Sequence, residues 1–139
     1  MNLPLARSDI IGKVVRRVYR SAWLEDDDGY AGCAVFVELA DGTLFELQGV
    51  DFGDVEPIRR LDPTKTQMIA VDEHTAERCC GKTAIEVLAS DQWPTIGLLL
   101  SDGKLLITSD DCSPRRVGPC VLDVGSVYKE NDYVPYWCQ

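Results

Sequence analysis

Histidine is nearly absent from this sequence, and C-x-x-C cysteine pairs are missing. It contains one histidine, His74, and none of its six cysteines is spaced as C-x-x-C. Zinc sites and dithiol redox centres are usually built from such residues. The polar neighbours of His74 predict a solvated histidine rather than half of a Cys–His nucleophile pair. We therefore predict no metal site, no cofactor and no catalytic residue.

Several enzyme motifs are missing as well. The chain has no G-x-S-x-G, no Walker loop and no G-x-G-x-x-G. These motifs present a nucleophilic serine or arrange backbone N–H groups around phosphates. Their absence favours a binding protein over an enzyme.

Positive charge is scarce. Lys and Arg number 14 against 23 Asp and Glu, which gives a formal net charge of −9. Such a surface repels nucleic-acid backbones and anionic membranes. It attracts cationic molecules and speeds their encounter. The partner expected from charge is therefore a protein with a basic surface, and not a nucleic acid or a membrane.

Long hydrophobic runs are also lacking. No segment approaches the length of a transmembrane helix, and Arg7 and Asp9 interrupt the apolar character of the first residues. We therefore expect a cytoplasmic protein, in which most cysteines are free thiols. At 139 residues, the chain is expected to form a single domain over 1–139.

Two similar hairpins are the clearest feature present. Asp-Gly turns lie between apolar runs in 34–48 and again in 96–109. A Gly-Lys segment precedes each hairpin, as "GKVVRRVYRS" and "GKTAIEVLAS", and an Arg-Arg-x-x-Pro segment follows each. Because the three segments recur in the same order, we predict an internal repeat of 10–73 and 80–130.

The repeat predicts a mainly β fold. Each copy reads as βββ-β, so we expect about eight strands from two tandem repeats sharing one core, as a sandwich or a barrel. Two separate small barrels of the SH3-like kind are the alternative. At most one or two short helices are expected. One of them is predicted over 72–80, where Asp72 can cap the N-terminus of the helix and Gly81 can end it. The aromatic C-terminal segment is expected to pack back onto the body.

The run Glu25, Asp26, Asp27 and Asp28 is the sharpest charge feature. Its carboxylates are consecutive, whereas a calcium loop places them at alternate positions. A solvated loop and a contact surface for a basic partner are the two remaining interpretations. The loop is also the main difference in length between the two copies, and binding residues often lie in such insertions. We take these four residues as the candidate partner-binding site.

Two arginine pairs and several strand-end acids offer further candidates. Arg59 and Arg60 match Arg115 and Arg116 in the sequence repeat. They are interpreted either as salt-bridge pairs with the protein's own carboxylates or as two anion sites. The acids that follow the hairpins can cap turns or perform acid–base chemistry. These acids are Asp51, Asp54, Asp110 and Asp111.

The segments "IIGKVVRRVY" and "VFVELADGTLFELQG" resemble small bacterial β-rich domains of the immunity-protein type. The resemblance implies an acidic cytoplasmic protein that binds and blocks a toxin. Our leading hypothesis is therefore a non-enzymatic binding protein, in its most specific form an inhibitor of a basic toxin. One alternative is a small-ligand-binding or enzymatic β-barrel that uses strand-end carboxylates. Another is an oligomeric scaffold subunit that buries Tyr133, Tyr136 and Trp137 against a second chain.

Overall fold

The structure is a computed structural model that describes residues 4–48, 57–90, 96–109, 112, 115–123 and 133–138. Its strands are β1 (Val15–Arg20), β2 (Leu24–Glu25), β3 (Ala31–Gly32), β4 (Val35–Leu39), β5 (Leu44–Leu47), β6 (Ile69–Ala70), β7 (Ala84–Ser90), β8 (Ile96–Leu100), β9 (Lys104–Ser109), β10 (Arg116–Asp123) and β11 (Tyr133–Pro135). The helices are α1 (Glu73–Cys79) and three 3-10 turns, η1 (Arg7–Asp9), η2 (Pro63–Lys65) and η3 (Tyr136–Cys138). The prediction of a mainly β protein is confirmed.

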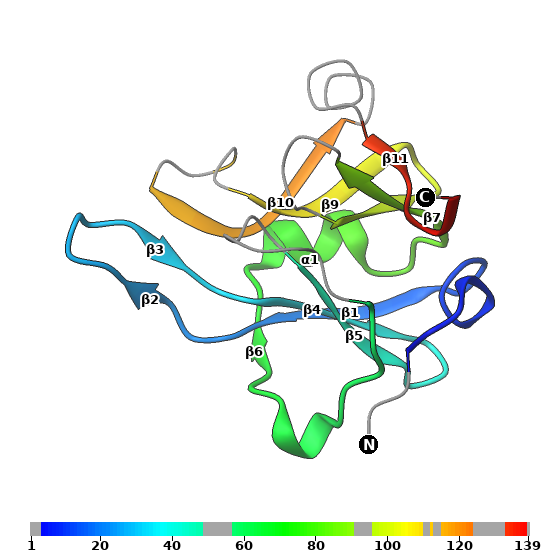
Figure 1. The fold of residues 1–139 in the computed structure, drawn as a ribbon, viewed down its shortest axis with the longest axis horizontal. Coiled ribbons are helices and arrows are strands. Elements are labelled where there is room, and N and C mark those ends of the chain that lie inside the picture. The colour runs from blue at the N-terminus through cyan, green and yellow to red at the C-terminus, as the bar shows by residue number, and fades with distance from the viewer. Residues whose placement is uncertain are drawn as a thin grey trace.

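The strands form two open sheets. One has the order β5-β4-β1-β6 and the other the order β11-β7-β8-β9-β10-β3-β2. The barrel alternative is therefore wrong, since neither sheet closes on itself. The sheets lie one above the other in Figure 1, and α1 contacts both β1 and β10.

One hydrophobic core joins the two sheets. Val18, Val37 and Phe45 from the first sheet are buried in the same cluster as Val87 and Leu98 from the second. This shared cluster contradicts the alternative of two separate small barrels. Sharing is favourable because a larger common core buries a greater fraction of the chain's apolar surface.

The second hairpin is apolar on both faces because it lies inside its sheet. Leu98 and Leu106 belong to the shared core, whereas Leu105 and Ile107 belong to a second cluster on the other face. Gly97 makes room for this second cluster, since a Cβ there would come within 2.7 Å of the Ile107 side chain.

The two halves of the chain use the same strand pairing. Val15 pairs with Leu39 and Ala84 with Leu100, and a register shift follows directly in both ladders. Reciprocal hydrogen bonds then join the halves. Gly12 N donates to Ala84 O, and Gly81 N donates to Val15 O, both at 2.8 Å. The gene duplication that would explain this correspondence stays a prediction.

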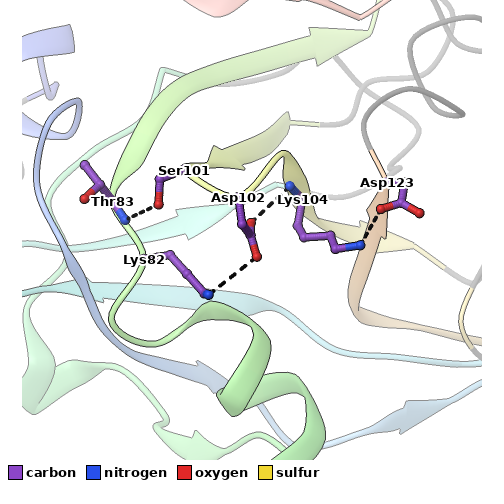
Figure 2. Close-up of polar contacts among 6 residues, drawn as sticks. All are labelled: Lys82, Thr83, Ser101, Asp102, Lys104 and Asp123. Carbon is purple, nitrogen blue, oxygen red and sulfur yellow. Dashed lines mark hydrogen bonds and ion pairs between the residues drawn. The ribbon is translucent and has the colours of Figure 1, made fainter.

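The Gly-Lys and Asp-Gly motifs meet in space. Figure 2 shows Lys82 directed at Asp102, with a Nζ–Oδ2 distance of 3.6 Å, while Asp102 Oδ1 accepts from Lys104 N at 3.1 Å. The same arrangement recurs in the first half, where Lys13 forms an ion pair with Asp41. Each lysine therefore ties the start of its unit to the turn of the following hairpin.

The third pair of matching segments does not occupy corresponding places. In the first half, β6 pairs with β1 (Tyr19 opposite Ala70). The strand in that position beside β7 is β11, where Leu88 lies opposite Pro135. β10, which the sequence repeat matches to the segment of β6, instead pairs with β9 in the interior of its sheet. The correspondence between the halves therefore does not extend to this segment.

The helix and the C-terminal segment follow their sequence signals. Asp72 caps α1 by accepting hydrogen bonds from Thr75 N at 3.2 Å and Thr75 Oγ1 at 2.7 Å. Tyr136 and Trp137 pack against the shared core, and the Tyr136 hydroxyl accepts from Ile58 N at 3.3 Å. Within the described ranges, no helix combines the length and apolar composition needed to cross a bilayer.

Candidate functional site

A short hairpin of residues 24–32, which we call the arm, extends from the second sheet. Figure 1 shows β2 and β3 reaching outward beyond the other strands. Leu24 pairs with Gly32 and Glu25 with Ala31. The arm therefore consists of only two residue pairs and the acidic turn between them.

Asp26 builds the turn of the arm. Its Oδ1 accepts hydrogen bonds from Asp28 N and Tyr30 N, both at 2.9 Å. Its own backbone N–H donates to Tyr30 O at 2.8 Å. An aspartate that accepts from the backbone two residues onward stabilises a turn by mimicking a backbone carbonyl. Asp26 thus has a structural role, unlike the other acids of the run.

Most of the other arm side chains face solvent, whereas Ala31 is buried. Glu25, Asp27 and Asp28 are exposed and form no ion pair with any described residue. Leu24 is 77% exposed and Tyr30 47% exposed. The arm therefore exposes both apolar and acidic side chains.

The start of β10 holds the base of the arm. β3 pairs in parallel with β10, and Ala31 N donates to Arg115 O at 2.8 Å. The Arg115 guanidinium lies over the Tyr30 ring, 5.8 Å from its centroid. Arg115 also has a φ of 65°, in the left-handed region that costs energy for a residue with a Cβ. The hydrogen bond to Ala31 and the contact with Tyr30 offset this cost.

Trp23, just before the arm, lies against the backbone of Gly118. A Cβ at position 118 would come within 2.6 Å of the indole ring, so only glycine allows this approach. Two guanidinium groups lie over the same ring, that of Arg20 at 5.3 Å and that of Arg116 at 5.2 Å from its centroid. Such cation–π contacts hold the arginine side chains in place.

Beside Trp23 is a pocket of about 540 Å³, which we call the arginine pocket. Its walls come from β1, β10, α1 and the segments around them. The lining residues are Arg20, Trp23, Ala70, Val71, Asp72, His74, Thr75, Arg78, Ser109, Cys112, Arg116, Gly118, Pro119 and Val121.

Positive charge dominates this lining. Arg20, Arg78 and Arg116 form no ion pair with any residue that the structure describes. Asp72 is the one carboxylate among the lining residues. Thr75 donates hydrogen bonds to this carboxylate, which lowers the Asp72 pKa. Burial raises the pKa of the nearby Cys33 thiol, and the Arg20 charge opposes that rise. The field inside the pocket therefore favours anions.

Cys79 and Cys80 are not activated nucleophiles. Burial raises the pKa of Cys79 to about 12 and also raises that of Cys80, so both remain neutral thiols near pH 7. His74 is exposed and lines the arginine pocket. No group of three or more His, Cys, Asp or Glu side chains in the described part of the chain is arranged to hold a metal ion.

One disulfide departs from the expectation of free thiols. Cys112 and Cys120 are joined, with their Cα atoms 5.5 Å apart, because the chain reverses between β9 and β10 and brings them together. Cys33, Cys79 and Cys80 are free, as expected. Disulfides persist mainly in oxidising compartments. The pair therefore weighs against the cytoplasmic location, which stays a prediction.

The predicted arginine pairs lie in different surroundings. Arg116 lines the arginine pocket and Arg115 contacts the arm. Arg59 forms a backbone bridge with Pro4, and Arg59 and Arg60 are exposed. The strand-end acids Asp51, Asp54, Asp110 and Asp111 lie outside the described residues.

Sequence reasoning named Arg116 as a candidate anion-binding or salt-bridge residue but missed the other residues that make the arginine pocket. Arg20 belonged to a predicted strand, Arg78 to a predicted helix and Gly118 to a predicted loop, and none of them stood out as a binding residue. The pocket depends on strand pairings between segments about 85 residues apart, such as β3 with β10. One local signal was available, since Trp23 stands between Arg20 and the acidic run.

Comparisons with known proteins give no relative. No family model, no curated protein and no solved structure matches this chain.

Proposed function

We propose that this protein is a non-enzymatic binding protein that docks its arm onto a protein with a basic surface. Leu24 carries the proposal: it is 77% exposed on an edge strand, and the exposed acids Glu25, Asp27 and Asp28 follow it in the same arm. Burying a leucine side chain contributes roughly 1.5–3 kcal/mol. A partner that covers Leu24 and presents lysines or arginines to the acids gains the free energy of leucine burial and the attraction between opposite charges.

Charge supports a basic partner. All four acids of the arm are exposed, on a chain whose net charge is −9. Complementary charge steers two proteins together and raises the association rate more than it lengthens the life of the complex. Leu24 and Tyr30 would then supply the contacts that slow dissociation, since aromatic and apolar anchors dominate interface energetics.

The arm is also preorganised. Asp26 fixes its turn with two hydrogen bonds of 2.9 Å, and the Arg115 guanidinium lies over the Tyr30 ring. A rigid binding element loses less conformational entropy when it docks. The resemblance to immunity-type domains makes inhibition of a basic toxin the most specific form of the proposal.

The alternatives have less support. Tyr136 and Trp137 already pack against the chain's own core, which removes them as exposed anchors for a second subunit. The arginine pocket is lined by arginines and one carboxylate, Asp72, rather than by the several acids that an acid–base site needs.

The proposal is tested by measuring binding kinetics with arm variants. Immobilised protein captures partners from cell extract, and each purified partner is assayed by surface plasmon resonance. Asp27→Asn with Asp28→Asn should slow association several-fold at low salt, and the effect should fade at physiological salt, where charges are screened beyond about 8 Å. Leu24→Ser should speed dissociation instead.

A matched control removes the same charge elsewhere. Glu73→Gln with Glu77→Gln changes two exposed acids on α1, away from the arm. This variant should leave both rate constants unchanged. The proposal would be refuted if the binding rate constants of a purified partner were unchanged by Leu24→Ser and by the substitutions of the arm acids. It would also be refuted if all captured partners were acidic.

A further inference from the structure

We propose that the arginine pocket binds a small organic molecule through an oxyanion, a phosphate or carboxylate group. The inference concerns a different surface from the arm and does not depend on the proposed function. Three arginines from three elements line the pocket: Arg20 from β1, Arg78 from α1 and Arg116 from β10. This concentration of positive charge occurs in a chain of net charge −9.

The described lining of the pocket carries more positive than negative charge, with three arginines and one carboxylate, Asp72. Like charges that share a pocket repel each other, so a bound anion would lower that repulsion. Asp72 stays ionised, because Thr75 N and Thr75 Oγ1 donate to its carboxylate and lower its pKa, and it offsets one of the three arginine charges in the lining. The remaining positive charge favours an oxyanion in the pocket, which would accept charge-assisted hydrogen bonds.

Two of the three arginines are held before any ligand arrives. Arg20 and Arg116 lie over Trp23, and Gly118 lets the indole sit close to β10. Guanidinium groups bind phosphate and carboxylate through paired N–H donors in a fixed plane. Because the Arg20 and Arg116 guanidinium groups are ordered before the ligand binds, less conformational entropy is lost on binding. Such preorganisation is typical of a binding site rather than of a merely solvated basic surface.

The dimensions of the arginine pocket indicate an organic ligand rather than a bare ion. Its volume of about 540 Å³ lies in the range of small-molecule sites, which is roughly 300–1,000 Å³. Part of its wall is apolar, from Val71, Pro119 and Val121. The ligand class is therefore a small molecule with an oxyanion at the basic wall and a carbon skeleton at the apolar wall.

The test uses phenyl phosphate and inorganic phosphate as probes, titrated by isothermal calorimetry in 150 mM salt. Phenyl phosphate should bind with a stoichiometry of one and more tightly than inorganic phosphate. Arg78→Gln and Arg116→Gln should each weaken binding about ten-fold or more, the loss expected for hydrogen bonds to a charged group. Benzoate serves as the carboxylate counterpart and shows which oxyanion the arginine pocket prefers.

Arg16→Gln is the matched control. It removes the same charge from an arginine outside the pocket that pairs with Glu38 at 3.1 Å. Its binding should equal that of the unchanged protein, and circular dichroism checks that all variants fold. Either of two results would overturn the proposal: no saturable binding of phenyl phosphate or benzoate up to millimolar concentrations, or an equal loss in Arg16→Gln.

Discussion

The indole of Trp23 occupies the space that a side chain at Gly118 would fill. An added Cβ would come within 2.6 Å of the ring and 3.1 Å of Cys33 Sγ. This contact joins the segment before the arm to β10, and it brings Trp23 beneath two guanidinium groups. The arm and the arginine pocket therefore share one structural support.

Replacing this glycine tests that support. Gly118→Ala should lower the free energy of unfolding by about 1–3 kcal/mol, because overpacking displaces the indole or the β10 backbone. Urea denaturation measures the change. Gly32→Ala is the control, since a Cβ there would meet only Val117 O at 3.8 Å, an ordinary contact. A tolerated Gly118→Ala would show that Trp23 is not held against β10.

Asp26 is expected to act through structure rather than through charge. Asp26→Ala removes the acceptor of two backbone hydrogen bonds and should loosen the arm, at a cost of about 1 kcal/mol. Asp26→Asn keeps a side-chain oxygen and should preserve the turn. Amide hydrogen exchange at Asp28 and Tyr30 measures the difference: fast exchange in Asp26→Ala and slow exchange in Asp26→Asn. Equal protection in the two variants would contradict the assigned role.

The disulfide is expected to stabilise the junction of β9 and β10. Reduction, or Cys112→Ser, should lower the free energy of unfolding by about 2–3 kcal/mol, the loop-closure entropy of a short loop. Cys112 is the better position to change because it is exposed, whereas Cys120 is buried. Cys33→Ser serves as the control, since Cys33 is free. Six reactive thiols in the unfolded, unreduced protein would show that the bond does not form.

The sequence was sufficient to predict the two hairpins but not the ion pairs that join them to the Gly-Lys segments. Asp-Gly turns and alternating apolar residues predicted both hairpins because turn chemistry and strand periodicity are local. The Gly-Lys segments were recognised only as similar strings, although Lys13 and Lys82 pair with the aspartates of those turns. Those pairings connect residues about 20–30 positions apart, so no local pattern encodes them.

The acidic run shows the same limit at the candidate site. Its four carboxylates were given one role, yet Asp26 is a turn residue while Asp27 and Asp28 face solvent. Composition predicts the charge of a loop, but only the backbone geometry decides which carboxylate accepts its hydrogen bonds. The grouping of Arg116, a predicted anion-site candidate, with Arg20 and Arg78 was missed for a related reason, since the three are far apart in sequence.

Cys79 should make the fold sensitive to alkaline pH. Burial raises its pKa from an ordinary value of 9.0 to about 12, so the folded thiol stays protonated where the unfolded thiol ionises. Its stabilising contribution is therefore complete below pH 9 and is lost as the pH rises from 9 towards 12. In that window the free energy of unfolding should fall by up to about 1.4 kcal/mol per pH unit.

Urea denaturation at pH 8, 9.5 and 10.5 measures this loss, and Cys79→Ala isolates it from other titrating groups. The variant is less stable at pH 8, because it leaves a small cavity beneath α1. Its stability should nevertheless change less between pH 8 and 10.5 than that of the unchanged protein. Cys33→Ala is the comparison for a half-buried thiol, whose pKa burial also raises while Arg20 opposes the rise. If the pH dependence of Cys79→Ala equals that of the unchanged protein, the thiol ionises as readily in the fold as outside it, and the core beside α1 admits solvent.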